Sequence, residues 1–115
     1  MARNSLTKTE ATRNGFPTDG VTLTFETANT TDKEQVVLTG KEIIIAHNTG
    51  VGAATVTINS VAYLGRTGDI TADSIAAGAM HIYGPFDLRG WKQSDGNLYL
   101  EASSTDVDFA VITIP

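Results

Sequence analysis

Two histidines and a few carboxylates are the residues of this 115-residue chain best suited to chemistry. His47 lies in the stretch IIIAHNTGVGAATVTI, beside the glycine pair G-V-G. A glycine-rich loop that binds phosphate leads into a helix whose N-terminus faces the anion. The residues after this pair, AATVTI, are typical of a strand instead. We therefore predict a β-hairpin in which NTGVGA joins residues 41–47 to residues 54–61.

Neither His47 nor His81 has the sequence neighbours that catalysis requires. A general base needs a nucleophile or an orienting carboxylate within hydrogen-bond reach, and no serine lies in a G-x-S-x-G elbow. Two histidines without any cysteine exclude histidine-rich and thiolate metal sites. We expect both histidines at strand ends or interfaces. We predict no catalytic residue, no cofactor, no metal site and no enzymatic activity.

Asp69 and Asp73 lie close together in GRTGDITADS, which raises the question of calcium. An EF-hand loop requires the pattern D-x-[DN]-x-[DN]-G and a glutamate at its twelfth position, and both are missing. Two alternatives stay open. One is a simple two-carboxylate calcium site, and the other, which we favour, is a solvated loop in which Arg66 pairs with Asp69.

The aromatic residues raise the question of carbohydrate binding. Trp91 is the single tryptophan, and Tyr63, Tyr83 and Tyr99 fall on different predicted strands. Because Trp91 follows a glycine and precedes a predicted hairpin, we favour its burial at the edge of the fold over a sugar platform.

Composition restricts the class of partner. The net charge is −5 and the pI is about 4.7, with the basic residues dispersed, which opposes nucleic-acid binding. No apolar run approaches the ~18 residues of a membrane span, and the first residues have no apolar core of a secretory signal. We therefore expect neither a nucleic-acid nor a membrane partner.

The elements that must position these residues are strands. Residues 1–19 are polar and end in the turn formers NGFPTDG, so we predict an extended arm that is poorly ordered without a partner. Residues 20–115 show seven or eight short strand signals with turns between them and no helical period. The predicted fold is all-β, a small antiparallel β-sandwich or jelly-roll-like domain that follows an N-terminal arm.

Individual segments sharpen this prediction. In VTLTFET (residues 21–27) apolar and polar residues alternate, which indicates a half-buried antiparallel strand. Three consecutive isoleucines, residues 43–45, indicate a strand covered on both faces or packed against another subunit. WKQSDGNLYLEA is the clearest hairpin signal, because Asp95-Gly96 favours a tight turn between strands.

Several of these segments together resemble a family of small virion proteins of tailed phages and prophages. The resemblance covers about residues 36–115 and rests on IIIAHNTG with ATVTI, GRTGDIT, IAAGAMHIYGPF, WKQSDGNLYLEA and FAVITIP. It implies a head decoration (cement) protein with a compact β-fold and no catalytic residues. It also implies the major capsid protein as partner and the outer capsid surface as location, after synthesis in the host cytoplasm.

A decoration protein must bind across the seams of a shell. We expect a homotrimer at threefold or quasi-threefold positions, held by the arm and by one end of the β-domain. Deleting residues 1–15 should then abolish capsid binding and leave the fold intact. The residues expected to contact the capsid or another subunit are Arg3, Lys8, Arg13, Phe16, Ile44, Tyr83 and Phe86.

Two other readings stay open. One keeps the virion but makes the protein a tail, head–tail joining or adhesin-like component, in which Trp91 and the tyrosines line a glycan or receptor groove. The other is a small β-domain enzyme or calcium-dependent module that uses the histidines, Asp69 or Asp73.

Overall fold

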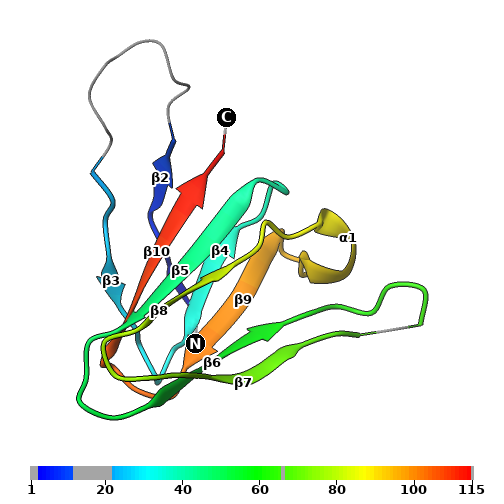
Figure 1. Cartoon of the computed structure of the whole chain (residues 1–115). Coiled ribbons are helices and arrows are strands. Elements are labelled where there is room, and N and C mark those ends of the chain that lie inside the picture. The colour runs from blue at the N-terminus through cyan, green and yellow to red at the C-terminus, as the bar shows by residue number, and fades with distance from the viewer. Residues whose placement is uncertain (1–2, 12–21, 66, 115) are drawn as a thin grey trace.

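The protein is a β-sandwich, and a computed structural model describes residues 3–11, 22–65 and 67–114 (Figure 1). These residues form ten strands and one short helical segment, arranged in two sheets that face each other across a common apolar core. The all-β prediction is confirmed. The bounds are β1 Asn4–Ser5, β2 Lys8–Glu10, β3 Glu26–Thr27, β4 Glu34–Val37, β5 Glu42–Asn48, β6 Ala54–Asn59, β7 Ile70–Ile75, β8 Met80–Tyr83, α1 Leu88–Trp91, β9 Asn97–Ala102 and β10 Val107–Thr113.

Sheet I has the strand order β1-β4-β9-β6-β7, and sheet II has the order β2-β10-β5-β8 with β3 also paired to β10. Most pairs are antiparallel, but β1 pairs with β4 and β2 pairs with β10 in parallel. The sheets are therefore mixed, whereas the sequence predicted an antiparallel fold. From β4 onward only β6 and β7 are neighbours both in the sequence and within one sheet.

The hairpin predicted for residues 41–61 is wrong. β5 pairs with β10 and β8 in sheet II, while β6 pairs with β9 and β7 in sheet I. The loop NTGVGA therefore crosses from one sheet to the other. Its glycines indicated a hairpin turn, but neither Gly50 nor Gly52 adopts the positive φ that such a turn would need.

Buried Asn48 fixes this crossing. Its side-chain amide donates to the carbonyl oxygens of Gly52 (2.8 Å) and Ile75 (3.0 Å), and its Oδ1 accepts from the Gly50 N–H (3.0 Å). Gly50 also lies against the loop before β10, where a Cβ atom would meet the Asp106 Cγ at 2.8 Å. The hydrogen bonds of the Asn48 side chain and the close packing of Gly50 against Asp106 thus determine the shape of the loop.

The isoleucine run, residues 43–45, lies on β5 and contributes to both faces of sheet II. Ile44 and Ala46 belong to the core between the sheets, while Ile45 is buried but lies outside that core cluster. Side chains alternate across a strand, so Ile45 points to the outer side of sheet II. Coverage on both faces was one of the two alternatives for this run, and Ile44 and Ile45 fit it.

The N-terminal residues belong to the sandwich. Ser5 pairs with β4 of sheet I, and three residues later β2 pairs with β10 of sheet II. Between them Leu6 is buried in the core, and its N–H donates to the Gln35 carbonyl (2.8 Å). These residues are extended, as expected, but they complete both sheets instead of forming a separate arm. Residues 12–21, the rest of that arm, lie outside the described residues.

Two strand predictions need smaller corrections. Of residues 21–27 only Glu26–Thr27 form a strand, β3, and Val21 lies outside the described residues. The Asp95-Gly96 turn is present, with Gly96 at φ 88° and the Asn97 N–H donating to Asp95 Oδ1 (3.1 Å). It joins α1 to β9, however: Lys92 and Gln93 before it form neither helix nor strand, although the Gln93 N–H donates to the Asn97 carbonyl (2.8 Å) across the turn.

Candidate functional site

The residues expected to contact a capsid mostly make contacts within the chain. Ile44, Tyr83 and Phe86 are buried in the core, so they offer no surface to a partner. Their apolar character led us to an interface, but the second sheet already covers them. Arg13 and Phe16 lie outside the described residues.

Two of the three basic residues of the expected arm, Arg3 and Lys8, also make contacts within the chain. Lys8 forms a salt bridge with the buried Glu42 (Nζ to Oε2, 2.9 Å). Arg3 donates to the carbonyl oxygens of Glu34 (3.1 Å) and Leu100 (3.3 Å), and its guanidinium lies over the Tyr99 ring. Both side chains therefore hold the N-terminal strands on the sandwich.

One histidine does have an orienting carboxylate. His81 Nδ1 lies 2.8 Å from Asp73 Oδ2, and the Tyr83 hydroxyl donates to the same oxygen at 2.5 Å. The hydrogen bonds from Tyr83 and His81 lower the pKa of Asp73. No serine, threonine or cysteine hydrogen-bonds to His81 among the described residues, so the cluster lacks a nucleophile. Its structural effect is to link β7 of sheet I to β8 of sheet II.

The aspartates considered for calcium are committed to different partners. Asp69 Oδ1 accepts from the backbone N–H (2.7 Å) and the hydroxyl (2.6 Å) of Ser60, and these bonds lower the pKa of Asp69. Asp73 belongs to the cluster above. Within residues 3–11, 22–65 and 67–114, no three His, Asp or Glu side chains gather as a metal site would require. Arg66, the expected partner of Asp69, lies outside the described residues.

His47 has a different setting. It lies on β5 and packs edge-on against Phe25, with ring centroids 6.1 Å apart. In register it stands between Asp108 of β10 and Met80 of β8. It is an interior residue of a strand near one end of sheet II, which is close to the strand-end position that we expected.

The outer face of sheet II is apolar. Ile45 stands opposite Ile82 on one side and Ala110 on the other, and Ile112 stands opposite Ile43. Directly opposed residues share a face, so these side chains form one surface. Met80 and Ile82 are its most exposed members, at 55% and 68%. We call this surface the outer face of sheet II; it comprises Ile43, Ile45, Met80, Ile82, Ala110 and Ile112.

This face ends at an unpaired strand edge. β8 is the last strand of sheet II, and its only partner in the described chain is β5. The Asn48 N–H donates to the Ala79 carbonyl (3.0 Å), and hydrogen-bonded pairs alternate along an antiparallel ladder. Met80 and Ile82 therefore direct their backbone N–H and C=O groups away from β5. Edges of this kind can accept a further strand.

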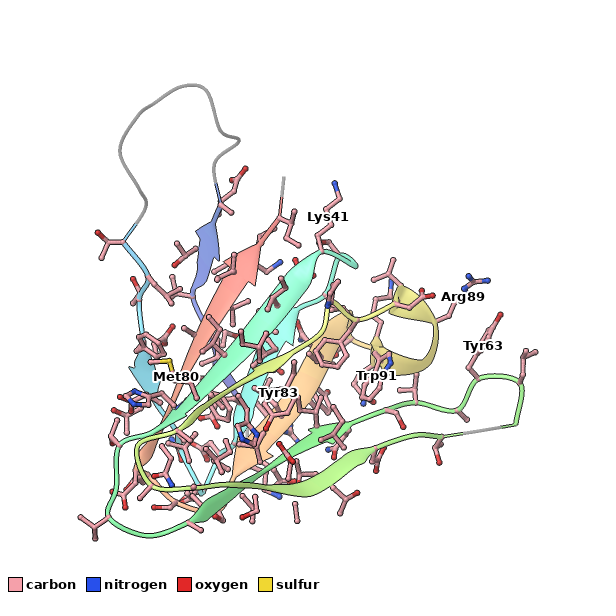
Figure 2. All side chains as sticks on the ribbon, in the orientation of Figure 1. Lys41, Tyr63, Met80, Tyr83, Arg89 and Trp91 are labelled. Atoms are coloured by element: carbon pink, nitrogen blue, oxygen red, sulfur yellow. The ribbon has the colours of Figure 1, made fainter. Side chains whose placement is uncertain are left out.

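A second feature lies at another end of the molecule. The loop between β6 and β7 and the α1 segment enclose an open groove of about 480 Å³. In Figure 2 the labelled Tyr63, Arg89 and Trp91 lie at this end, and Met80 lies at the opposite side. Figure 2 also shows Arg89 beside Tyr63. The groove is lined by Ser60, Val61, Tyr63, Leu64, Gly90 and Trp91, together with Thr67 and Gly68.

Sequence reasoning missed one of these features and described two of them only in part. The pairing of His81 with Asp73 joins two strands of different sheets, and the sequence does not reveal which strands meet at a corner. The isoleucine run was predicted to be covered on both faces or packed against another subunit, but the sequence does not show that β8 pairs with β5 and places Met80 and Ile82 beside Ile45. A groove lined by Trp91 and the tyrosines was one of the alternatives, but of the three tyrosines Tyr63 lines it with Trp91, because a loop–helix contact with no local signal brings these two together.

The chain matches no family model, no curated protein and no solved structure in comparisons with each. Among the described residues, no helix is long and apolar enough to cross a membrane.

Proposed function

We propose that this protein is a non-enzymatic decoration protein of a tailed-phage capsid, which binds the major capsid protein and stabilises the shell. The motifs in residues 36–115 suggest the virion. The structural observation that supports a binding role is the outer face of sheet II, an apolar surface that borders an unpaired strand. Large apolar surfaces of this kind usually mark a site of interaction.

This face suits attachment to a protein shell. Its six members are uncharged, and Asp108, which stands opposite His47 on the same side of the sheet, would have to stay at the rim of the interface to keep its hydration. Buried apolar surface stabilises by roughly 25 cal/mol per Å², and a specific interface buries on the order of 1,000 Å² or more. The free N–H and C=O groups of Met80 and Ile82 could add backbone hydrogen bonds to a capsid strand.

The contact surface in this proposal differs from the one expected from the sequence. Met80 and Ile82, the exposed members of this face, replace the buried Ile44, Tyr83 and Phe86. The N-terminal strands hold the domain together instead of reaching out. We retain a homotrimer at threefold or quasi-threefold positions on the outer capsid surface, because several linked copies bind a symmetric shell by avidity.

The location can be tested by quantitative mass spectrometry of purified virions after separation of heads from tails. A decoration protein should be present in hundreds of copies per particle and fractionate with the major capsid protein. A few tens of copies in the tail fraction would replace this proposal by a joining or adhesin role. Absence from the particle would reject both.

The contact face can be tested with a matched pair of variants. Ile82→Lys places a charge in the outer face of sheet II, while Leu64→Lys makes the same change at an exposed residue of the β6–β7 loop. In co-sedimentation with shells of the cognate major capsid protein, we expect Ile82→Lys to weaken binding at least tenfold and Leu64→Lys to bind like the wild type. Equal binding of both variants would exclude this face.

A further inference from the structure

The groove between the β6–β7 loop and α1 is a built feature of the fold. The Val61 N–H donates to the Gly90 carbonyl at 2.7 Å, which joins the loop to the helical segment. Ser60 holds the other end of the loop, since its hydroxyl donates to Asp69 Oδ1 (2.6 Å) and accepts from the Gly68 N–H (2.8 Å). A site whose walls are already connected loses little entropy when a ligand binds.

Two aromatic rings line this groove. Trp91 packs against buried Phe86, with ring centroids 4.8 Å apart, so its position is set by the core. Tyr63 is 41% exposed and carries the Arg89 guanidinium over its ring, 5.6 Å from the centroid. Arg89 Nη1 also lies 3.3 Å from the Tyr63 hydroxyl. Each of the two rings is thus held by a neighbouring side chain, Trp91 by Phe86 and Tyr63 by Arg89.

The polar groups lie at the rim. Arg89 is largely exposed, and its guanidinium has more donors than Tyr63 and the long contact with Asp87 use. Thr67 lines the groove on the loop side. The volume of about 480 Å³ is within the usual range for small-ligand sites, which combine apolar walls with a few polar groups.

We infer that this groove is a saccharide-binding site, which takes an uncharged pyranose ring of a glycan. The faces of aromatic rings are electron-rich and attract the polarised C–H groups on the flat side of a sugar. Arg89, held beside Tyr63 at the rim, and Thr67 in the lining supply the polar groups that the hydroxyls of a sugar would need. The carboxylates of Asp69 and Asp87 beside the groove disfavour a polyanionic ligand. This site is independent of the outer face of sheet II.

The single tryptophan of the chain provides a direct measurement. A glycan array probed with the whole protein identifies candidates, and maltose, cellobiose, lactose and N-acetylglucosamine serve as soluble probes. A bound sugar should change the emission of Trp91, because the ring lines the groove. We expect saturable binding of at least one array glycan or soluble probe, with a dissociation constant in the micromolar to millimolar range typical of weak binding.

Variants separate the groove from the rest of the surface. Tyr63→Ala removes an exposed ring and should weaken glycan binding at least tenfold. Tyr99→Ala is the matched control, because Tyr99 also has an arginine over its ring (Arg3, 4.2 Å from the centroid) but lies on β9 and does not line the groove. It should leave binding within twofold. Circular dichroism of each variant checks that the fold is retained.

Three outcomes would overturn the inference. The first is no binding to any array glycan and no emission change with millimolar soluble sugars. The second is glycan binding that Tyr63→Ala leaves unchanged. The third is a change in Trp91 emission with peptides of the capsid protein but with no glycan, which would make the groove a peptide site. Shell binding by Tyr63→Ala and glycan binding by Ile82→Lys should both stay normal, so this inference and the proposed function can fail separately.

Discussion

Two buried glutamates, Glu42 and Glu34, have carboxyl pKa values that are shifted in opposite directions. Glu42 is fully buried, which by itself would raise its pKa, but hydrogen bonds from the Thr39 N–H (2.6 Å) and hydroxyl (2.7 Å) and from Lys8 outweigh burial and lower it. Glu34 is equally buried, and its one hydrogen bond from the Asn29 N–H (2.6 Å) is too little, so burial raises its pKa. Its second oxygen has no partner in the described structure.

Replacement of each glutamate by glutamine should therefore have different effects. Glu42→Gln removes charge-assisted hydrogen bonds and should lower the free energy of unfolding by about 1.5–3 kcal/mol at pH 7. Glu34→Gln keeps an acceptor for Asn29 and removes a buried charge, so we expect a change below about 1 kcal/mol. Urea unfolding at pH 7 measures both. Equal losses would show that hydrogen bonding does not distinguish the two sites.

The pH dependence should have opposite signs. Because the folded pKa of Glu42 is lowered, its contribution is present above the ordinary carboxylate value of about 4.3 and is lost as pH falls through the folded value. The deficit of Glu42→Gln should thus shrink below about pH 4. The raised pKa of Glu34 has the opposite effect, because its ionisation destabilises the folded state. The free energy of unfolding of Glu34→Gln should therefore increase relative to the wild type as pH rises from about 4 to 7.

At the scale of the element, alternation predicted strands well and partners poorly. AATVTI contributes to a strand as predicted, β6, in which Val56 and Ile58 are buried in the core. Pairing failed because a strand's own residues do not specify its neighbour: the loop after β5 has hairpin residues but crosses between sheets. The N-terminal strands were not predicted for another reason, since strands of two or three polar residues show no alternation of apolar and polar side chains.

The incorporation of the N-terminal strands into the sandwich can be tested directly. Leu6 lies between β1 and β2 and is buried in the core, so Leu6→Ala should lower the free energy of unfolding by about 2–3 kcal/mol. Thr7→Ala, a change at the exposed neighbouring side chain, should cost less than about 0.5 kcal/mol. Denaturant titration compares them. Wild-type stability in Leu6→Ala would restore the interpretation of residues 1–15 as a removable arm.

At the scale of the whole molecule, the candidate sites depend on contacts that no local pattern contains. The outer face of sheet II combines three strands, and the groove combines a loop with a helical segment. The sequence supplied the residue types, an isoleucine run and scattered aromatics. It did not supply the sheet to which each strand belongs, because that choice is made by the closing of one core around both sheets.

We expect slow folding, because the chain passes from one sheet to the other between most successive strands. From β4 to β10 most successive strands lie in different sheets, so pairing must wait for distant segments to meet. Domains dominated by such contacts fold in milliseconds to seconds. Stopped-flow refolding followed by the fluorescence of Trp91 should therefore give a main phase in this range. Completion within microseconds would show that local structure directs folding.

The position of β10 in sheet II also has a consequence for synthesis. β10 lies between β5 on one side and β2 and β3 on the other, so three strands made earlier have no partner there until Val107–Thr113 is available. While the ribosome is still translating this segment, the nascent chain cannot complete sheet II or its core. Premature release before residue 107 would leave the apolar edge of β5 open, and such a fragment should aggregate or be degraded.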